Sequence, residues 1–250
     1  MPGIPTSEFG LASRALPQGT LDGQEREQRL TRYGGVVAEI LSSKVYGYAD
    51  EGVYFTANNN GTGVATTAAP TSFSDTAPMF TIYNTDSTSN QLAKNIYLDW
   101  LRLTQTAAGT AGVDIRFRFV LDSTVPSAGT VYTPVNPNTV YPKSSSIAVP
   151  RLLPTGVTQS GNSRVPIGTI FGITTQTAPL TAGDEVYFNF GGSDTFFPIY
   201  SAAASTNVIR MAFNAPPIVL APGWCFMLEF LITSQSAASS WTVELGWWER

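Results

Sequence analysis

Alternating apolar and polar residues make the C-terminal part of the chain its most regular stretch. An apolar run at residues 218–220 leads into a turn, Ala221-Pro222-Gly223, and two longer segments follow at residues 224–232 and 241–248. Because strand side chains alternate between the two faces of a sheet, each segment aligns every second residue on one face. The apolar residues aligned in this way are Phe226, Leu228, Phe230, Trp241, Val243, Leu245 and Trp247. The pattern predicts a closing hairpin with one face to bury, and a C-terminus docked in a sheet or an interface.

The same pattern predicts strands along most of the chain. Short apolar or alternating segments, separated by Gly, Pro and Asn turns, lie at residues 45–48, 52–56, 79–83, 94–104, 112–123, 164–173, 185–190, 196–200 and 207–213. With the closing hairpin they give about ten strands, a spacing typical of a sandwich or barrel. Long connections between antiparallel strands favour a jelly roll. Residues 45–250 are therefore predicted to form one all-β domain, a jelly-roll-like antiparallel β-sandwich.

Three segments within this domain have features of their own. In residues 94–104 the alternation slips at Trp100-Leu101, which indicates a bulge or burial on both faces. Residues 112–123 alternate most cleanly, with apolar side chains inward and Asp114, Arg116 and Arg118 outward. Residues 123–163 hold six prolines and many Ser, Thr and Asn. A loop of this length is usually functional or packed on a partner, so we expect an excursion that wraps a neighbour or forms an exposed lobe.

Residues 1–44 differ in character from the rest. The first twenty are rich in Pro, Gly and Ser, with isolated apolar residues that include Phe9, Leu11 and Leu16. This composition predicts an extended arm that uses those three side chains as anchors on a neighbour, with disorder as the alternative. Asp22 and Glu25 form a weak capping box, so we expect a short helix over residues 23–33. Its arginines recur every third residue and share one face, either solvated or paired with carboxylates of a neighbouring subunit. They are Arg26, Arg29 and Arg32.

The charge content is unusually low. Charged residues make up 13% of the chain, about half the typical share, whereas 43% of the residues are hydrophobic. A surface of Thr, Ser, Asn, Ala and Gly favours a particle-bound protein partly covered by copies of itself over a neutral monomer. The net charge is −4 without a Lys/Arg run, so nucleic acid is not expected as a partner. A signal-peptide pattern and an apolar run long enough to span a membrane are both missing.

Few residues suit catalysis or metal binding. The chain contains no histidine, which excludes a Ser-His-Asp triad and histidine-ligated metals. The single cysteine, Cys225, lies in an apolar segment and is expected to be a small buried hydrophobe. Asp50-Glu51, Asp184-Glu185 and Asp194 are better explained as solvated loop charges than as a carboxylate site. We therefore predict a protein that is not an enzyme and has no cofactor.

Two short motifs point to a family. The turn "VLAPG" at residues 219–223 and the ending "VELGWWER" accompany a charge-poor β domain with an N-terminal arm. In these features the chain resembles structural proteins of tailed bacteriophages, and above all the small jelly-roll proteins that trimerise on the capsid as cement or decoration proteins. The resemblance is one of general character over residues 45–250 and assigns no functional residue by position. It implies a homotrimer on the virion surface, made in the host cytoplasm, with the major capsid protein as partner and the arm gripping the shell.

Two further functions stay open beside the cement role. One is a receptor-binding or tail-fibre head, whose exposed aromatic residues would stack on host glycans. The other is a jelly-roll protein that itself forms the shell, although the balanced charge of the first 44 residues lowers this possibility. At the last strand, aromatic residues favour oligomer packing over sugar binding. The predicted contacts to copies or partners are Phe9, Leu11, Leu16, Arg26, Arg29, Arg32, Trp241, Trp247 and Trp248.

Overall fold

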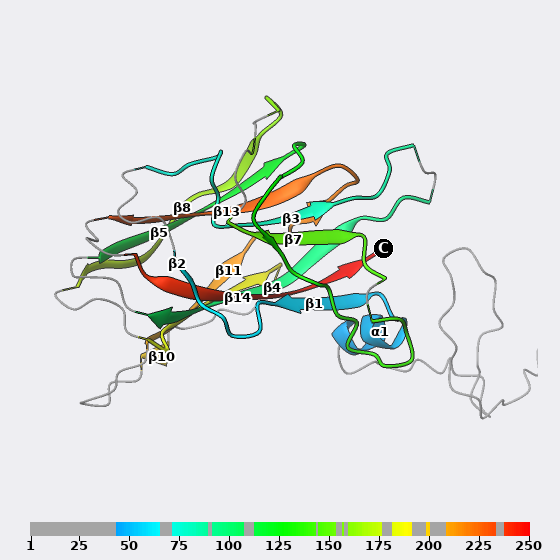
Figure 1. Ribbon diagram of the computed structural model, residues 1–250, viewed down its shortest axis with the longest axis horizontal. Coiled ribbons are helices and arrows are strands. Elements are labelled where there is room, and N and C mark those ends of the chain that lie inside the picture. Colours follow the sequence, from blue (N-terminus) through cyan, green and yellow to red (C-terminus); the bar gives the residue numbers. More distant parts are fainter. Residues whose placement is uncertain are drawn as a thin grey trace, which may run out of the picture.

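A computed structural model shows the protein as two β-sheets packed face to face, with one short helix at their edge (Figure 1). The structure describes residues 44–65, 72–89, 92–107, 113–143, 145–153, 157, 160–176, 182–191, 199–200, 209–233 and 238–250. The elements in chain order are α1 (Lys44–Asp50), β1 (Tyr54–Asn58), β2 (Val64–Ala65), β3 (Phe80–Asn84), β4 (Ile96–Ala107), β5 (Val113–Asp122), β6 (Thr130–Val131), β7 (Ala148–Leu152), β8 (Arg164–Gln176), β9 (Glu185–Phe190), β10 (Ile199–Tyr200), β11 (Ile209–Ala215), β12 (Val219–Leu220), β13 (Cys225–Thr233) and β14 (Ser240–Glu249).

Eight of the strands form a jelly roll. One sheet has the order β1-β14-β4-β9-β11-β10, with β2 and β12 at its margins, and the other has the order β6-β7-β3-β13-β5-β8. The antiparallel pairs β1·β14, β3·β13, β4·β9 and β5·β8 are nested, since the first of these eight strands pairs with the last and the fourth with the fifth. A ribbon wound in this way across two sheets is a jelly roll. The predicted fold class is confirmed.

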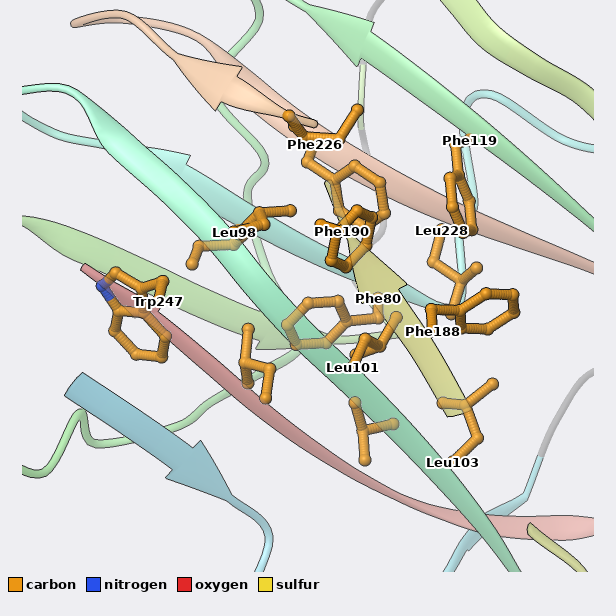
Figure 2. Packing of buried hydrophobic residues seen from close by; sticks show 14 of the residues in the cluster. Phe80, Leu98, Leu101, Leu103, Phe119, Phe188, Phe190, Phe226, Leu228 and Trp247 are labelled. Atoms are coloured by element: carbon orange, nitrogen blue, oxygen red, sulfur yellow. The ribbon is translucent and has the colours of Figure 1, made fainter. Parts of the chain in front are cut away.

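The core lies between the sheets and is lined by the residues that the alternation placed inward. Phe226 and Leu228 of β13 meet Trp241, Val243, Leu245 and Trp247 of β14 there, and all six are at most 2% exposed. Figure 2 shows phenylalanines and leucines of both sheets interdigitating with Trp247 at one side. Several phenylalanine pairs cross between the sheets edge to face, such as Phe119 with Phe188 at 5.0 Å.

The predicted closing hairpin is wrong in its pairing. Strand β13 pairs with β3 and β5 in one sheet, whereas β14 pairs with β1 and β4 in the other. The two strands therefore face each other across the core, where the rings of Phe230 and Trp241 lie 5.2 Å apart edge to face. Alternation identifies the face that a strand buries, but it does not identify the strand beside it.

The segment predicted as a loop excursion, residues 123–163, also contributes to the sandwich. It supplies β7, which pairs with β3 along one edge of the six-stranded sheet. Val135 then exchanges two backbone hydrogen bonds, of 2.9 and 2.7 Å, with Thr56 at the edge of the other sheet. This part of the chain therefore closes one side of its own sandwich, and the expectation of a loop over its whole length is corrected. Its contact with a neighbour stays a prediction.

Two local predictions have opposite outcomes. The bulge expected from the slip at Trp100-Leu101 is confirmed, but it lies just before this pair: Gly246 pairs with Trp100 and Trp247 with Leu98, which leaves Asp99 as the additional residue. The strand expected at residues 45–48 is wrong, since these residues belong to α1. Packing overrides their β-propensity: Tyr48 of the helix stacks on Trp248 at 5.0 Å. The predicted arm and the helix at residues 23–33 lie outside the described residues.

Candidate functional site

The outer face of the eight-stranded sheet carries an unusual concentration of aromatic side chains. Since inward residues of β1, β14, β4 and β9 are apolar and buried, the residues between them point away from the core. Helix α1 adds Tyr48 at one end of this face. We call the set the aromatic face; its members are Tyr48, Tyr54, Tyr97, Trp100, Tyr187 and Trp248.

The first row of this face is a stack of three rings. Trp248 lies between Tyr48 and Tyr97, with ring centroids 5.0 and 5.6 Å apart, and only 9% of it is exposed. The Arg250 guanidinium lies over Tyr48 at 5.7 Å. Val219, which pairs with Tyr97, extends the row and is 48% exposed. Stacking of this kind fixes α1 and the C-terminus on the sheet.

The second row is built around a glycine. Strand β14 has Gly246 opposite Trp100, and a Cβ at this position would lie 2.4 Å from both Trp100 Nε1 and Tyr54 Oη. The indole therefore reaches over the glycine toward β1, where its Nε1 donates a hydrogen bond of 2.9 Å to Tyr54 Oη. Tyr54 Oη in turn donates to Asp99 Oδ2 at 2.9 Å. The bulge at Asp99 thus places a carboxylate within this row.

Tyr187 and an ion pair complete the surface. The rings of Trp100 and Tyr187 are 14° from parallel, with centroids 6.2 Å apart. Arg102 pairs across the strands with both Tyr187 and Glu244, and its guanidinium forms an ion pair with Glu244. The Arg102 and Glu244 side chains are 41% and 30% exposed. Hydrogen-bonding groups of both signs therefore lie beside the rings.

Two tyrosines of this surface, the buried Tyr54 and the partly buried Tyr187, stay neutral. Burial raises the pKa of Tyr54 well above its usual value, and the nearby Asp99 carboxylate raises it further. Burial and Asp99 also raise the pKa of Tyr187, while Arg102 lowers it. Each phenol therefore keeps its proton at physiological pH, and that of Tyr54 is donated to Asp99.

Substituting Gly246 by alanine tests this arrangement. We expect the added methyl group to displace the Trp100 indole and to lower the free energy of unfolding by about 1–3 kcal/mol, as overpacking does. Urea unfolding followed by tryptophan fluorescence measures both effects. Gly168→Ala is the matched control, because a Cβ at this strand position meets nothing within 4 Å. Equal midpoints for the two variants would contradict the placement of the indole over Gly246.

The predicted contact residues fall into three groups: buried in the core, on the aromatic face, or outside the described residues. Trp241 and Trp247 are both 0% exposed in the chain's own core, so their predicted role in a subunit interface is corrected. Trp248 lies on the aromatic face. The remaining predicted contacts lie outside the described residues: Phe9, Leu11, Leu16, Arg26, Arg29 and Arg32.

Sequence reasoning missed the central members of the face. Tyr97, Trp100 and Tyr187 occupy the outward positions of β4 and β9, where polar residues are expected. Aromatic residues at polar positions of an alternating strand were the available signal. The alternation of β4 alone does not reveal it, because the bulge shifts the pattern at Trp100.

The opposite face of the sandwich holds a partly buried ion cluster around one buried carboxylate. Arg118 of β5 points outward, as predicted, and binds Glu229 of β13 through Nε at 2.7 Å and Nη2 at 2.6 Å. It also pairs with Asp75 and lies 5.0 Å over the Phe73 ring. Glu229 is 1% exposed, and burial raises its pKa despite the opposing effect of Arg118. These contacts within the chain explain the outward position of Arg118, so no contact with a partner protein is needed to explain it.

Among the described residues, no three His, Cys, Asp or Glu side chains gather to hold a metal ion. Burial raises the pKa of the Cys225 thiol to about 12, so this side chain is unreactive. No helix in the described part has the length and apolarity needed to cross a membrane. Comparison with protein-family models, with curated proteins and with solved structures finds no match to this chain. Functional inference therefore depends on the jelly roll and its aromatic face.

Proposed function

We propose that the protein is a non-enzymatic virion structural protein, a cement or decoration protein that trimerises on the capsid of a tailed bacteriophage. The observation that carries the proposal is the nested pairing of eight strands, from β1·β14 to β5·β8. Jelly rolls of this kind are the domain type of many viral capsid proteins and of lectins. This is an argument from fold, and the low charge and the sequence resemblance direct it to the capsid.

The N-terminal segment supplies the contact to the shell in this proposal. It joins the sandwich at α1, which is held to the eight-stranded sheet by the stack of Tyr48 on Trp248. A fixed junction of this kind lets the residues before it transmit load between the sandwich and the particle. Phe9, Leu11 and Leu16 would bury their side chains against the major capsid protein.

A capsid-binding experiment with the full-length chain tests the proposal. Light scattering of the purified protein is expected to give a trimer, three copies of 26.8 kDa or about 80 kDa. The trimer is expected to bind isolated capsids of its phage in co-sedimentation. Replacing Phe9, Leu11 and Leu16 together by serine is expected to abolish binding and to leave the thermal unfolding midpoint unchanged.

The control variant is Leu92→Ser, which changes a residue between β3 and β4 that is 84% exposed. It is expected to bind capsids as the unmodified chain does. A particle of many dozens of copies would instead identify a shell protein. A trimer that ignores capsids would overturn the cement role in favour of a receptor-binding head.

A further inference from the structure

The Trp100 indole lies against the neighbouring strand and is in ring contact with Tyr187. Its Nε1 and Cε2 lie 2.4 and 2.8 Å from the position that a Cβ on Gly246 would occupy. A ring this close to the backbone of the neighbouring strand lies over that strand instead of standing upright on its own. The hydrogen bond to Tyr54 Oη holds the ring in this orientation. Trp100 is only partly buried, so part of the ring stays accessible.

Tyr187 enlarges this apolar surface. Its ring is 14° from parallel to the indole, and it too is only partly buried. The two stacked rings, on adjacent strands, form a partly exposed apolar patch with polar atoms at its rim. The rim contains the Asp99 carboxylate, which accepts a hydrogen bond from Tyr54, and the Arg102–Glu244 ion pair, which is partly exposed to solvent.

We propose that this part of the aromatic face, Trp100 and Tyr187 with Asp99, Arg102 and Glu244, is a carbohydrate-binding site. The C–H face of a pyranose is apolar and flat, so it packs on aromatic rings, while its hydroxyl groups lie at the ring edge. There, carboxylate oxygens accept hydrogen bonds from hydroxyls and a guanidinium donates to them. Aromatic side chains with a few placed polar groups are the usual composition of such small-molecule sites.

The charges on the face favour a neutral sugar over other occupants. Two carboxylates, Asp99 and Glu244, flank the rings against one guanidinium, and the chain carries a net charge of −4. Phosphates of a nucleic acid would be repelled, although its bases could stack on the rings. The centre of a stable subunit interface is depleted of charged residues, whereas here an ion pair lies beside the rings. A polyhydroxylated, uncharged ligand is not repelled by the carboxylates and can form hydrogen bonds with the ion pair.

Affinity electrophoresis tests the site with defined probes. The full-length protein is run in native gels that contain mannan, galactomannan, dextran, glycol chitin or hydroxyethyl cellulose, and calorimetry follows with oligosaccharides of the polymer that retards it. We expect retardation in at least one gel. Trp100→Ala and Tyr187→Ala are each expected to weaken binding about tenfold or more, which corresponds to roughly 1.4 kcal/mol.

Tyr141→Ala is the matched control, because this tyrosine is 40% exposed and packs on Gly52 outside the proposed site. It is expected to bind as the unmodified chain does. Near-ultraviolet circular dichroism confirms that each variant is folded, and Glu244→Gln gives a second test that leaves the rings in place. Migration unaffected by all five polysaccharides would overturn the proposal. Full affinity of the folded Trp100→Ala and Tyr187→Ala variants would also overturn it. If these two substitutions instead change the mass measured by light scattering, the face is a subunit interface.

Discussion

Replacing Trp247 by alanine is expected to lower the free energy of unfolding by about 3–5 kcal/mol. The side chain is 0% exposed between the sheets, and its ring stacks on Phe55 at 6.1 Å. Its Nε1 also donates a hydrogen bond of 3.0 Å to Glu249 Oε1. The truncation therefore leaves both a large cavity and a buried carboxylate without one of its donors. Guanidinium unfolding at equilibrium measures the loss.

Trp247→Phe separates these two contributions. It keeps most of the ring volume but removes the indole N–H, so we expect a smaller loss, of about 1–3 kcal/mol. Glu249 would keep its hydrogen bonds from the Ser146 hydroxyl and the Ile147 backbone N–H. If the alanine variant unfolds at nearly the same denaturant concentration as the unmodified chain, Trp247 is not a core residue and the placement of β14 is wrong.

Glu249 explains why the chain end is part of the fold. Its carboxylate, 1% exposed, joins β14 to residues 146 and 147, which precede β7 in the other sheet. Asn95 and Arg250 exchange two backbone hydrogen bonds next to it, of 2.6 and 3.0 Å. The C-terminal strand thus connects both sheets. The tryptophans near the C-terminus indicated this docking, but the polar contacts that secure it were not predictable from them.

The sequence predicted the strands and their inward faces better than their partners. Phe226 and Trp247 point inward as expected, yet β13 and β14 lie in different sheets. Local alternation is a property of one strand, whereas pairing in a jelly roll joins strands far apart in the chain. For the same reason the sequence did not reveal β7, which lies in a proline-rich segment and whose partner β3 is four strands earlier in the chain.

The candidate site was still harder to predict. Its geometry depends on Gly246 of β14, the bulge at Asp99 of β4 and Tyr187 of β9, three positions that only the fold brings together. A glycine in a strand signals a close approach, and aromatic residues at outward positions signal a binding or packing surface. Without the strand order β14-β4-β9, the sequence does not show that the glycine and these aromatic residues are neighbours.

Substituting Arg118 by methionine is expected to lower the free energy of unfolding by about 3–5 kcal/mol at pH 7, because it leaves the buried Glu229 charge uncompensated. Glu229 Oε1 already has no hydrogen-bond partner among the described residues. Arg102→Met is the matched control. Its partner Glu244 is 30% exposed, so the loss there should stay below about 1 kcal/mol.

The pH dependence of this loss distinguishes a buried charge from lost packing. Burial raises the pKa of Glu229 above its value in the unfolded chain, and Arg118 partly opposes the shift. A folded state with the higher pKa holds the proton more tightly, so stability is greatest below the unfolded pKa and falls as pH rises through the folded pKa. Removing Arg118 raises that pKa further. The variant should therefore lose most at neutral pH and progressively less toward pH 4.

A second substitution checks this cause directly. Glu229→Gln removes the charge that Arg118 compensates, so the double variant with Arg118→Met is expected to recover most of the lost stability and to lose the added pH dependence. Denaturant titrations between pH 4 and 8 on the single and double variants give both quantities. A loss for Arg118→Met that is the same at every pH, or that Glu229→Gln does not relieve, would mean that packing of the Arg118 stem against Phe73 and the sheet, and not its charge, stabilises this face.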